Sequence, residues 1–189
     1  MIIPTNSSQF IKFYKIKYLN QCNRFENSFF LDVAIKSRSY GIDAEILFGI
    51  LILEKLNRGN LLVRVLEILG VYLIPWYLIK KNVSIGLGQV KIGTAREVLG
   101  NLKDKEILRV LINQSSNIEI VARLLRKYSD NVNREEDLLK TVSNLYITGK
   151  EKPFPNFQTE VHYLLLKWSV KNNIFRKQFL RKIKKVNIT

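Results

Sequence analysis

The run AEILFGILILEKLN, from Ala44 to Asn57, limits the fold more than any other stretch of the sequence. Its side chains are apolar on nearly every side of a helix. A helix of that kind has to be buried, whereas a surface helix carries a single apolar stripe. Asp43 precedes the run as a good N-cap residue, and Gly59 follows it as a C-terminal stop. We therefore predict a buried central helix around which the rest of the chain packs.

Helical patterns also fill most of the other segments, and strand signals are weak everywhere. We predict a predominantly α fold, a single globular helical domain with little or no sheet. Its parts are an N-terminal helical extension packed on the core (1–40), the core itself (41–150) and, after the KPFPNF connector, a basic C-terminal helix (151–189). Further helices are expected up to about Asn27, in Ser28–Ser39 and Asn60–Leu73, from starts at Thr94, Asp104 and Asn117, in 134–149, and in one long segment from about Thr159.

Two features stand out against this helical background. The stretch SIGLGQVKIGTAREVLG, Ser84 to Gly100, interrupts it with glycines, a serine and a glutamine, and Glu54 places a carboxyl group at the end of the apolar run. Burial in an apolar setting disfavours the charged form of a carboxyl group. A carboxylic acid still protonated near neutral pH is what a general acid for glycosidic bond cleavage requires. Taken alone, Glu54 is also explained as a solvated or ion-paired residue near a helix end.

Together, GIDAEILFGILILEK and SIGLGQVKIGTA resemble the superfamily of soluble lytic transglycosylases and goose-type lysozymes, which cleave peptidoglycan. The resemblance implies a lysozyme-like fold whose central helix carries the catalytic acid, here Glu54. It spans residues 41–149 and keeps the order of the family's segments. The matching residues are Ser84, Gly86, Leu87, Gln89, Val90, Thr94 and Ala95 in the second motif, Asn117 and Ile118 at a helix start, and Tyr146 and Gly149 in the third motif.

The resemblance also implies roles for these residues. The glycine turn brings backbone close to a sugar groove, because glycine has no Cβ in the way. Gln89 hydrogen-bonds in the site beside the acid, and Tyr146 packs against the acid and lines the groove. The implied substrate-binding residues are Ser84, Gly86, Leu87, Gln89 and Tyr146. From the residues alone, the turn is also explained as a plain helix-to-helix connection, and Tyr146 as an ordinary core aromatic.

The sequence departs from the family pattern at several positions. The family has serine, methionine, proline and asparagine where this chain has Lys55, Gly88, Ile92 and Ile147. The segment between Glu54 and Ser84 is also longer than usual, and its extra part (60–83) is either a lid or wall of the groove or one extra packed helix. Lys55 and Ile147 favour an alternative function, a catalytically inactive member that binds glycan without cleaving it.

The chemistry depends on the number of carboxylates that flank the bond. Glycosidases normally use two, but between Lys55 and Lys103 the only acidic residues are Glu67 and Glu97. Neither is in a loop near the glycine turn, where a water-activating group is expected. We therefore favour a lytic transglycosylase, in which one glutamate acts as acid and then as base, over a muramidase that hydrolyses the same bond. This mechanism implies no cofactor.

The net charge of +15 indicates an anionic partner, whether nucleic acid, anionic lipid or an anionic wall polymer. Peptidoglycan strands fit both the charge and the resemblance. A nucleic-acid-binding module is another alternative, supported by the lysines and aromatics of FIKFYKIKY. No recognised nucleic-acid motif is apparent, so we expect no nucleic-acid partner. The tail FRKQFLRKIKKVNIT is either a solvated helix face or an anchor to wall polymer or membrane, with an apolar stripe of Phe175, Phe179, Leu180 and Ile183.

Cys22 and His162 are the only cysteine and the only histidine. The chain therefore has no internal disulfide, and we expect neither a metal site nor a histidine-centred triad. Lysines are scattered through the first 20 residues, unlike a signal peptide. The apolar run Ile68–Ile79 is about a dozen residues, shorter than the ~20 of a membrane span. We expect a soluble protein that reaches the cell envelope by lysis or dedicated export, and the sequence leaves its oligomeric state open.

Overall fold

The helix α3 (Ala44–Asn57) runs through the middle of the molecule, and each of its residues from Glu45 to Glu54 is buried. The prediction of a buried central helix is confirmed. The computed structural model describes residues 7–58, 61–130, 132, 135–148 and 157–186. The Asp43 side chain caps α3 by accepting a hydrogen bond from the Glu45 amide at 2.7 Å. The predicted stop at Gly59 lies outside the described residues.

The described residues form helices and one short antiparallel hairpin, so the predicted mostly α, single-domain fold is confirmed. Helices α1, α2, α8, α10 and α11 all contact α3. Besides α3, the elements are α1 (Ser7–Asn23), α2 (Asn27–Tyr40), α4 (Leu61–Leu73), α5 (Pro75–Lys81), β1 (Ser84–Ile85), β2 (Val90–Lys91), α6 (Ile92–Leu99), α7 (Asp104–Ile112), α8 (Gln114–Ser129), α9 (Glu135–Thr148), α10 (Phe157–Lys171) and α11 (Ile174–Val186).

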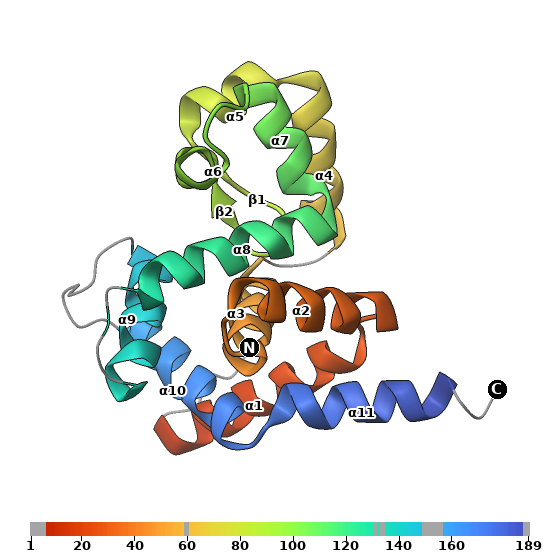
Figure 1. Ribbon diagram of the computed structural model, residues 1–189, viewed down its shortest axis with the longest axis vertical. Coiled ribbons are helices and arrows are strands. Elements are labelled where there is room, and N and C mark those ends of the chain that lie inside the picture. The colour runs from red at the N-terminus through yellow and green to blue at the C-terminus, as the bar shows by residue number, and fades with distance from the viewer. Residues whose placement is uncertain (1–6, 59–60, 131, 133–134, 149–156, 187–189) are drawn as a thin grey trace.

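The elements separate into two parts joined by α8 (Figure 1). The hairpin and helices α4 to α7 form the upper part of the view, and α1, α2, α3, α10 and α11 form the lower part. The long helix α8 lies across the junction, with α9 beside one of its ends. Because α3 ends where the upper part begins, Glu54 in its last turn lies close to this junction.

The lower part has a core rich in aromatic rings. Phe48 of α3 packs against Phe29 and Phe30 of α2 and against Phe175 of α11, with ring centroids 5.3 to 6.0 Å apart. Tyr18 of α1 is also fully buried. Residues 7–40 therefore belong to the same core as the central helix, and the part that sequence analysis describes as an extension is integral to the fold.

The C-terminal segment differs from its prediction. Instead of one long basic helix it forms two, α10 and α11, separated at Asn173, whose φ is +49°. Glu45 of α3 explains the second start, because its carboxylate accepts hydrogen bonds from the backbone amides of Phe175 and Arg176 at 2.8 and 2.9 Å. A carboxylate at a helix N-terminus satisfies free amides and interacts favourably with the helix dipole.

Two predicted helix starts are also wrong. Helix α6 begins at Ile92, before Thr94, and α8 begins at Gln114, before Asn117. In α8 the cap is Asn113, whose side chain accepts a hydrogen bond from the Ser116 amide at 3.0 Å. Asn113 and Asn117 both suit an N-cap, and the local sequence does not tell which of them occupies it.

Candidate active site

The glycine turn is the tip of the hairpin, between Ile85 and Val90, which face each other across β1 and β2. Gly86 has a φ of +80°, in the left-handed region that favours glycine. A Cβ there would overlap the Leu111 carbonyl and the Asn117 amide, and a Cβ at Gly88 would overlap Val121. These two glycines are therefore required by close packing of the turn onto α7 and α8. Sequence analysis attributes them instead to the approach of a ligand.

Asn117 holds the turn in place from beneath. Its side chain is fully buried, and its Oδ1 accepts a hydrogen bond from the Gly88 amide at 2.7 Å. Its Nδ2 donates to the carbonyls of Leu111 at 2.9 Å and Ile85 at 3.3 Å. Asn117 thus joins α7, α8 and the hairpin. Its match to the family motif has a structural reason here, which does not involve contact with a ligand.

Glu67 lies within a helix, α4, as expected from the sequence, and its side chain binds the other side of the turn. Its carboxylate accepts hydrogen bonds from the Gly86 amide at 3.3 Å and from Gln89 Nε2 at 3.1 Å. Arg58 donates to both of its oxygens, with Nε 3.0 Å from Oε1. The Arg58 and Glu67 side chains are 6% and 14% exposed, so this is a largely buried ion pair.

A groove of about 270 Å³ lies beside the hairpin and contains most of the predicted site residues. Glu54, Ser84, Gln89 and Tyr146 come from α3, β1, the turn and α9, and all four line it. Ile147, which stands at the family's asparagine, also lines it. The remaining lining residues are Asn57, Val90, Lys91, Thr94, Leu124, Tyr128, Leu145 and Gln158. Of the described residues that line this groove, Glu54 alone carries a carboxylate.

Tyr146 connects α9 to the turn, because its hydroxyl donates a hydrogen bond to the Gly88 carbonyl. Burial raises the pKa of the Tyr146 phenol well above its usual value, and the negative charge of Glu54 raises it further. The phenol is thus held as a hydrogen-bond donor at the edge of the groove. Gly149, which the resemblance pairs with Tyr146, lies outside the described residues.

His162 lies beside Glu54, a contact that the sequence does not indicate. It lies on α10, with its Nε2 3.7 Å from Glu54 Oε1, and the two side chains are 3% and 12% exposed. Neither ring nitrogen has a hydrogen-bond partner in the described part of the chain. Glu54 and His162 are far apart in the sequence and share no motif, so only the packing of α10 on α3 brings them together.

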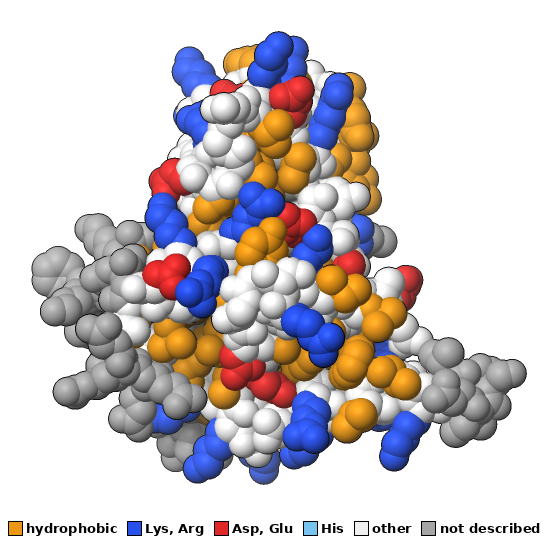
Figure 2. Space-filling view, in the orientation of Figure 1, with side chains coloured by type: hydrophobic (Ala, Val, Ile, Leu, Met, Phe, Trp, Pro, Cys, Tyr) orange, Lys and Arg blue, Asp and Glu red, His pale blue; other side chains and the backbone are white. Residues whose placement is uncertain are grey.

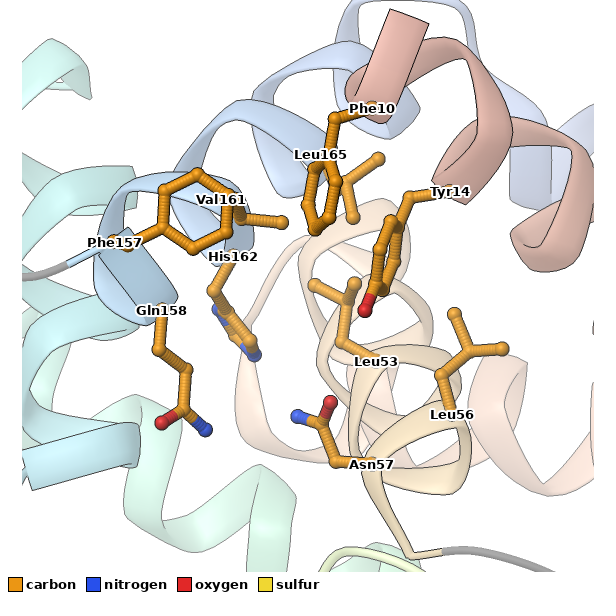
Figure 3. A pocket seen from close by; sticks show the side chains of 10 residues that line it. All are labelled: Phe10, Tyr14, Leu53, Leu56, Asn57, Phe157, Gln158, Val161, His162 and Leu165. Carbon is orange, nitrogen blue, oxygen red and sulfur yellow. The ribbon is translucent and has the colours of Figure 1, made fainter. Parts of the chain in front are cut away.

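An apolar pocket of about 120 Å³ lies between α1, α3 and α10, and His162 is one of the residues that line it (Figure 3). The rings of Phe10, Tyr14 and Phe157 surround one end of it, and Asn57, Gln158 and His162 lie toward the other. Asn57 and Gln158 also line the groove, so the apolar pocket and the groove have these two polar residues in common. The remaining lining residues are Leu53, Leu56, Val161 and Leu165.

The structure separates Gly86 and Leu87 from the other predicted site residues. Neither lines the groove; both line a smaller pocket of about 50 Å³ together with Lys55, Arg58 and Arg64. Burial lowers the pKa of Lys55, and the positive charges of Arg58 and Arg64 lower it further. Lys55 therefore belongs to this basic pocket, and its substitution for the family's serine does not change the lining of the groove.

Comparisons of the chain with protein-family models, with curated proteins and with solved structures each found no match. The likeness to lytic transglycosylases therefore stays a prediction from the motif residues. Within the described segments no group of three or more histidine, cysteine or acidic side chains is arranged to hold a metal ion.

Proposed function

We propose that this protein is a peptidoglycan lytic transglycosylase that cleaves the glycosidic bond between N-acetylmuramic acid and N-acetylglucosamine with Glu54. The observation that carries the proposal is the convergence of Glu54, Ser84, Gln89 and Tyr146 on one groove. These residues come from three separate segments, α3, the β1–β2 hairpin and α9, which the fold brings together. A chance likeness in sequence gives no reason for them to share a groove.

In the proposed reaction the Glu54 carboxyl first protonates the glycosidic oxygen, which leaves with the departing sugar. The resulting carboxylate then takes the proton from the C6 hydroxyl of the muramic acid residue as that oxygen bonds to C1. The products are a 1,6-anhydro sugar and a free hydroxyl, and no water is consumed. The Glu54 side chain is 12% exposed and lines the groove, so its carboxyl group can reach a glycan held there. We propose that His162 positions this carboxyl.

The second acidic group that a hydrolase needs is not found among the described groove residues, which supports a transglycosylase over a muramidase. Glu67 is close to the turn, but Arg58, Gly86 and Gln89 donate hydrogen bonds to its oxygens. It does not line the groove. Glu97 pairs with Lys127 at 2.9 Å, with both side chains more than half exposed. Neither glutamate is placed to activate a water in the groove.

The charge of the protein supports an anionic glycan as substrate. Lys91 lines the groove, and the chain as a whole carries +15. A cationic surface raises the encounter rate with an anionic polymer. A catalytically inactive glycan-binding module is the second candidate, and the observation in its favour is Ile147, an apolar residue on the groove wall where the family has asparagine.

The test is digestion of peptidoglycan sacculi by wild type and by Glu54→Gln, followed by mass spectrometry of the released muropeptides. We expect products lighter by one water than hydrolytic ones, and a loss of at least ~100-fold in the release rate for Glu54→Gln, typical of removing a general acid. Glu97→Gln is the matched control, since it makes the same chemical change on an exposed ion pair outside the groove. It should keep full activity.

Other outcomes would contradict the proposal in different ways. Products with a free reducing end, lost in Glu54→Gln, would make the protein a muramidase that uses the same acid. Binding to sacculi without release by wild type would identify the inactive module. Equal activity of wild type and Glu54→Gln would remove Glu54 from the mechanism. Thermal unfolding of each variant shows that the comparison is between folded proteins.

A further inference from the structure

The helices α4 and α5 carry a large apolar surface that faces away from the rest of the molecule. Leu73 is 72% exposed, Trp76 65%, Leu62 and Tyr72 63% each, and Leu66 58%. The other exposed apolar side chains of this segment are Val63, Val65, Leu69, Ile74 and Tyr77. Such a continuous apolar patch marks a surface that binds something apolar.

The exposure follows from which side of α4 faces the body. Leu62, Leu66, Leu69 and Leu73 succeed one another at intervals of four, three and four, which places them along one side of the helix. Val71, on the opposite side, is 5% exposed, and Glu67 reaches the glycine turn. The body of the protein therefore covers the side of this helix that carries Glu67 and Val71, and the leucine stripe is left outside.

The shape of the segment suits a surface parallel to a bilayer. No single described helix is long and apolar enough to cross a membrane. Only when taken together are α4 and α5 long and apolar enough for a membrane span, and the two helices are bent by 108° at their junction. Helix α4, with 13 residues, is ~20 Å long, less than the ~30 Å of a hydrocarbon core.

The chemistry around the leucine stripe favours anionic lipid over other occupants. Tyr72, Trp76 and Tyr77 are the residue types that concentrate where hydrocarbon meets headgroups. Arg64, Lys80 and Lys81 are exposed on the same two helices. The single acidic residue of segment 61–83 is Glu67, which is paired with Arg58. Figure 2 shows hydrophobic side chains along the outer edge of the upper part, with basic side chains around them.

We propose that the helix pair α4–α5 docks the protein on the surface of an anionic lipid bilayer. The leucine stripe and Trp76 enter the boundary between headgroups and acyl chains, and Lys80 and Lys81 contact lipid phosphates. This gives segment 60–83 a role distinct from the lid, groove wall or packed helix that sequence analysis considers. The proposal does not depend on the chemistry of Glu54, because none of the exposed residues of α4 and α5 lines the groove.

The C-terminal helix, which sequence analysis offers as the membrane or wall anchor, is less suited to docking. Phe175 of its predicted stripe is 6% exposed and belongs to the core, and Phe179 stacks on it with centroids 5.5 Å apart. Leu180 and Ile183 remain exposed on α11. Two of the four side chains of this predicted stripe are therefore already packed against the protein.

The test is co-sedimentation of the full chain with vesicles of phosphatidylcholine alone and with vesicles of equal parts phosphatidylcholine and phosphatidylglycerol. We expect preferential binding to the anionic vesicles, weakened at least ~10-fold in the double variant Leu69→Gln, Leu73→Gln. Leu31→Gln, Ile35→Gln is the matched control, since it removes two similarly exposed apolar side chains from α2. It should bind like wild type.

A second readout uses Trp76, one of two tryptophans. In a Trp168→Phe background its fluorescence should shift to the blue with anionic vesicles. The proposal would be overturned if the wild type bound neither kind of vesicle. It would also be overturned if the leucine double variant bound as strongly as the wild type. Self-association of the lipid-free protein that is abolished by the same double variant would also overturn it, because the face would then be an interface between two copies.

Discussion

The helices α3 and α4 are of nearly equal length and both are rich in leucine and isoleucine, yet one is the most buried element and the other the most exposed apolar one. Helix α3 is covered by α1, α2, α8, α10 and α11, whereas among the described helices α4 makes its main contacts with α5 and α7. An apolar helix is buried only when enough other elements surround it. Uncovered apolar surface on one helix of a folded protein indicates that a partner covers it.

The largest expected effect comes from removing the same side chain from both helices. Leu51 on α3 is fully buried and Leu66 on α4 is exposed. Leu51→Ala should lower the free energy of unfolding by about 2–5 kcal/mol, because it removes buried surface and leaves a cavity. Leu66→Ala should change it by less than about 0.5 kcal/mol. Urea unfolding of both variants measures this difference. An equal loss of unfolding free energy in the two variants would show that α4 is covered in solution.

Glycine-to-alanine substitutions should have opposite signs in the two helices. A Cβ on Gly49 would overlap Leu166 of α10, so Gly49→Ala should destabilise the protein by about 1–3 kcal/mol through overpacking. At Gly70 the nearest side-chain atom is 3.4 Å away, an ordinary contact. Gly70→Ala should therefore stabilise the protein by about 0.5–1 kcal/mol, the usual gain within a helix. Thermal melting distinguishes them, and a destabilising Gly70→Ala would show that the contact with Leu78 is too close for the added methyl group.

A smaller effect on stability is expected from Glu119, which joins α2 and α8, two of the helices that cover α3. Glu119 of α8 accepts hydrogen bonds from Lys36 at 2.6 Å and Tyr40 at 2.7 Å, both on α2. These bonds, first from Lys36, then from Tyr40 and Arg123, lower the Glu119 pKa from 4.5 to about 2. The ionised carboxylate therefore stabilises the fold above its unfolded-state pKa, and this contribution disappears as the pH falls toward 2.

Glu119→Gln should accordingly lower the free energy of unfolding by about 1 kcal/mol at pH 7. The effect is modest because the ion pairs of Glu119 with Lys36 and Arg123 are partly exposed. Measured by urea unfolding between pH 7 and pH 2, the difference from wild type should stay constant down to about pH 5 and then shrink. Glu97→Gln, at a more exposed pair, should show almost no difference at any pH. A Glu119→Gln cost that does not change with pH would contradict the assigned role of the charge.

Much of the local structure could be predicted because its causes lie within a few residues. Asp43 caps α3 as expected, and Gly41 ends α2 with a φ of +61°. The apolar run of α3 is buried, and the glycine turn interrupts the helices as expected. Glu54, Gln89 and Tyr146 were singled out from three short motifs, and the structure places them on one groove.

The rest of the site could not be predicted, because its contacts join residues without a shared local pattern. Nothing in the sequence indicates that His162 of α10 reaches Glu54, that Glu67 of α4 binds the turn, or that Asn117 supports it from beneath. Each contact depends on how helices from different parts of the chain pack. The sequence indicates a glycine turn and singles out Gly86, but the close packing of Gly86 and Gly88 against α7 and α8 is shown only by the tertiary structure.

The sequence by itself determined a mostly helical chain, its apolar central helix, its glycine turn and its strong positive charge, because helix propensity, capping and hydrophobic periodicity act over a few neighbouring residues. The tertiary structure decided which of the two apolar helices is covered. It also decided which carboxylate faces the groove and which one holds the turn. These outcomes depend on packing between distant segments, and a short run of residues contains no information about what will lie against it.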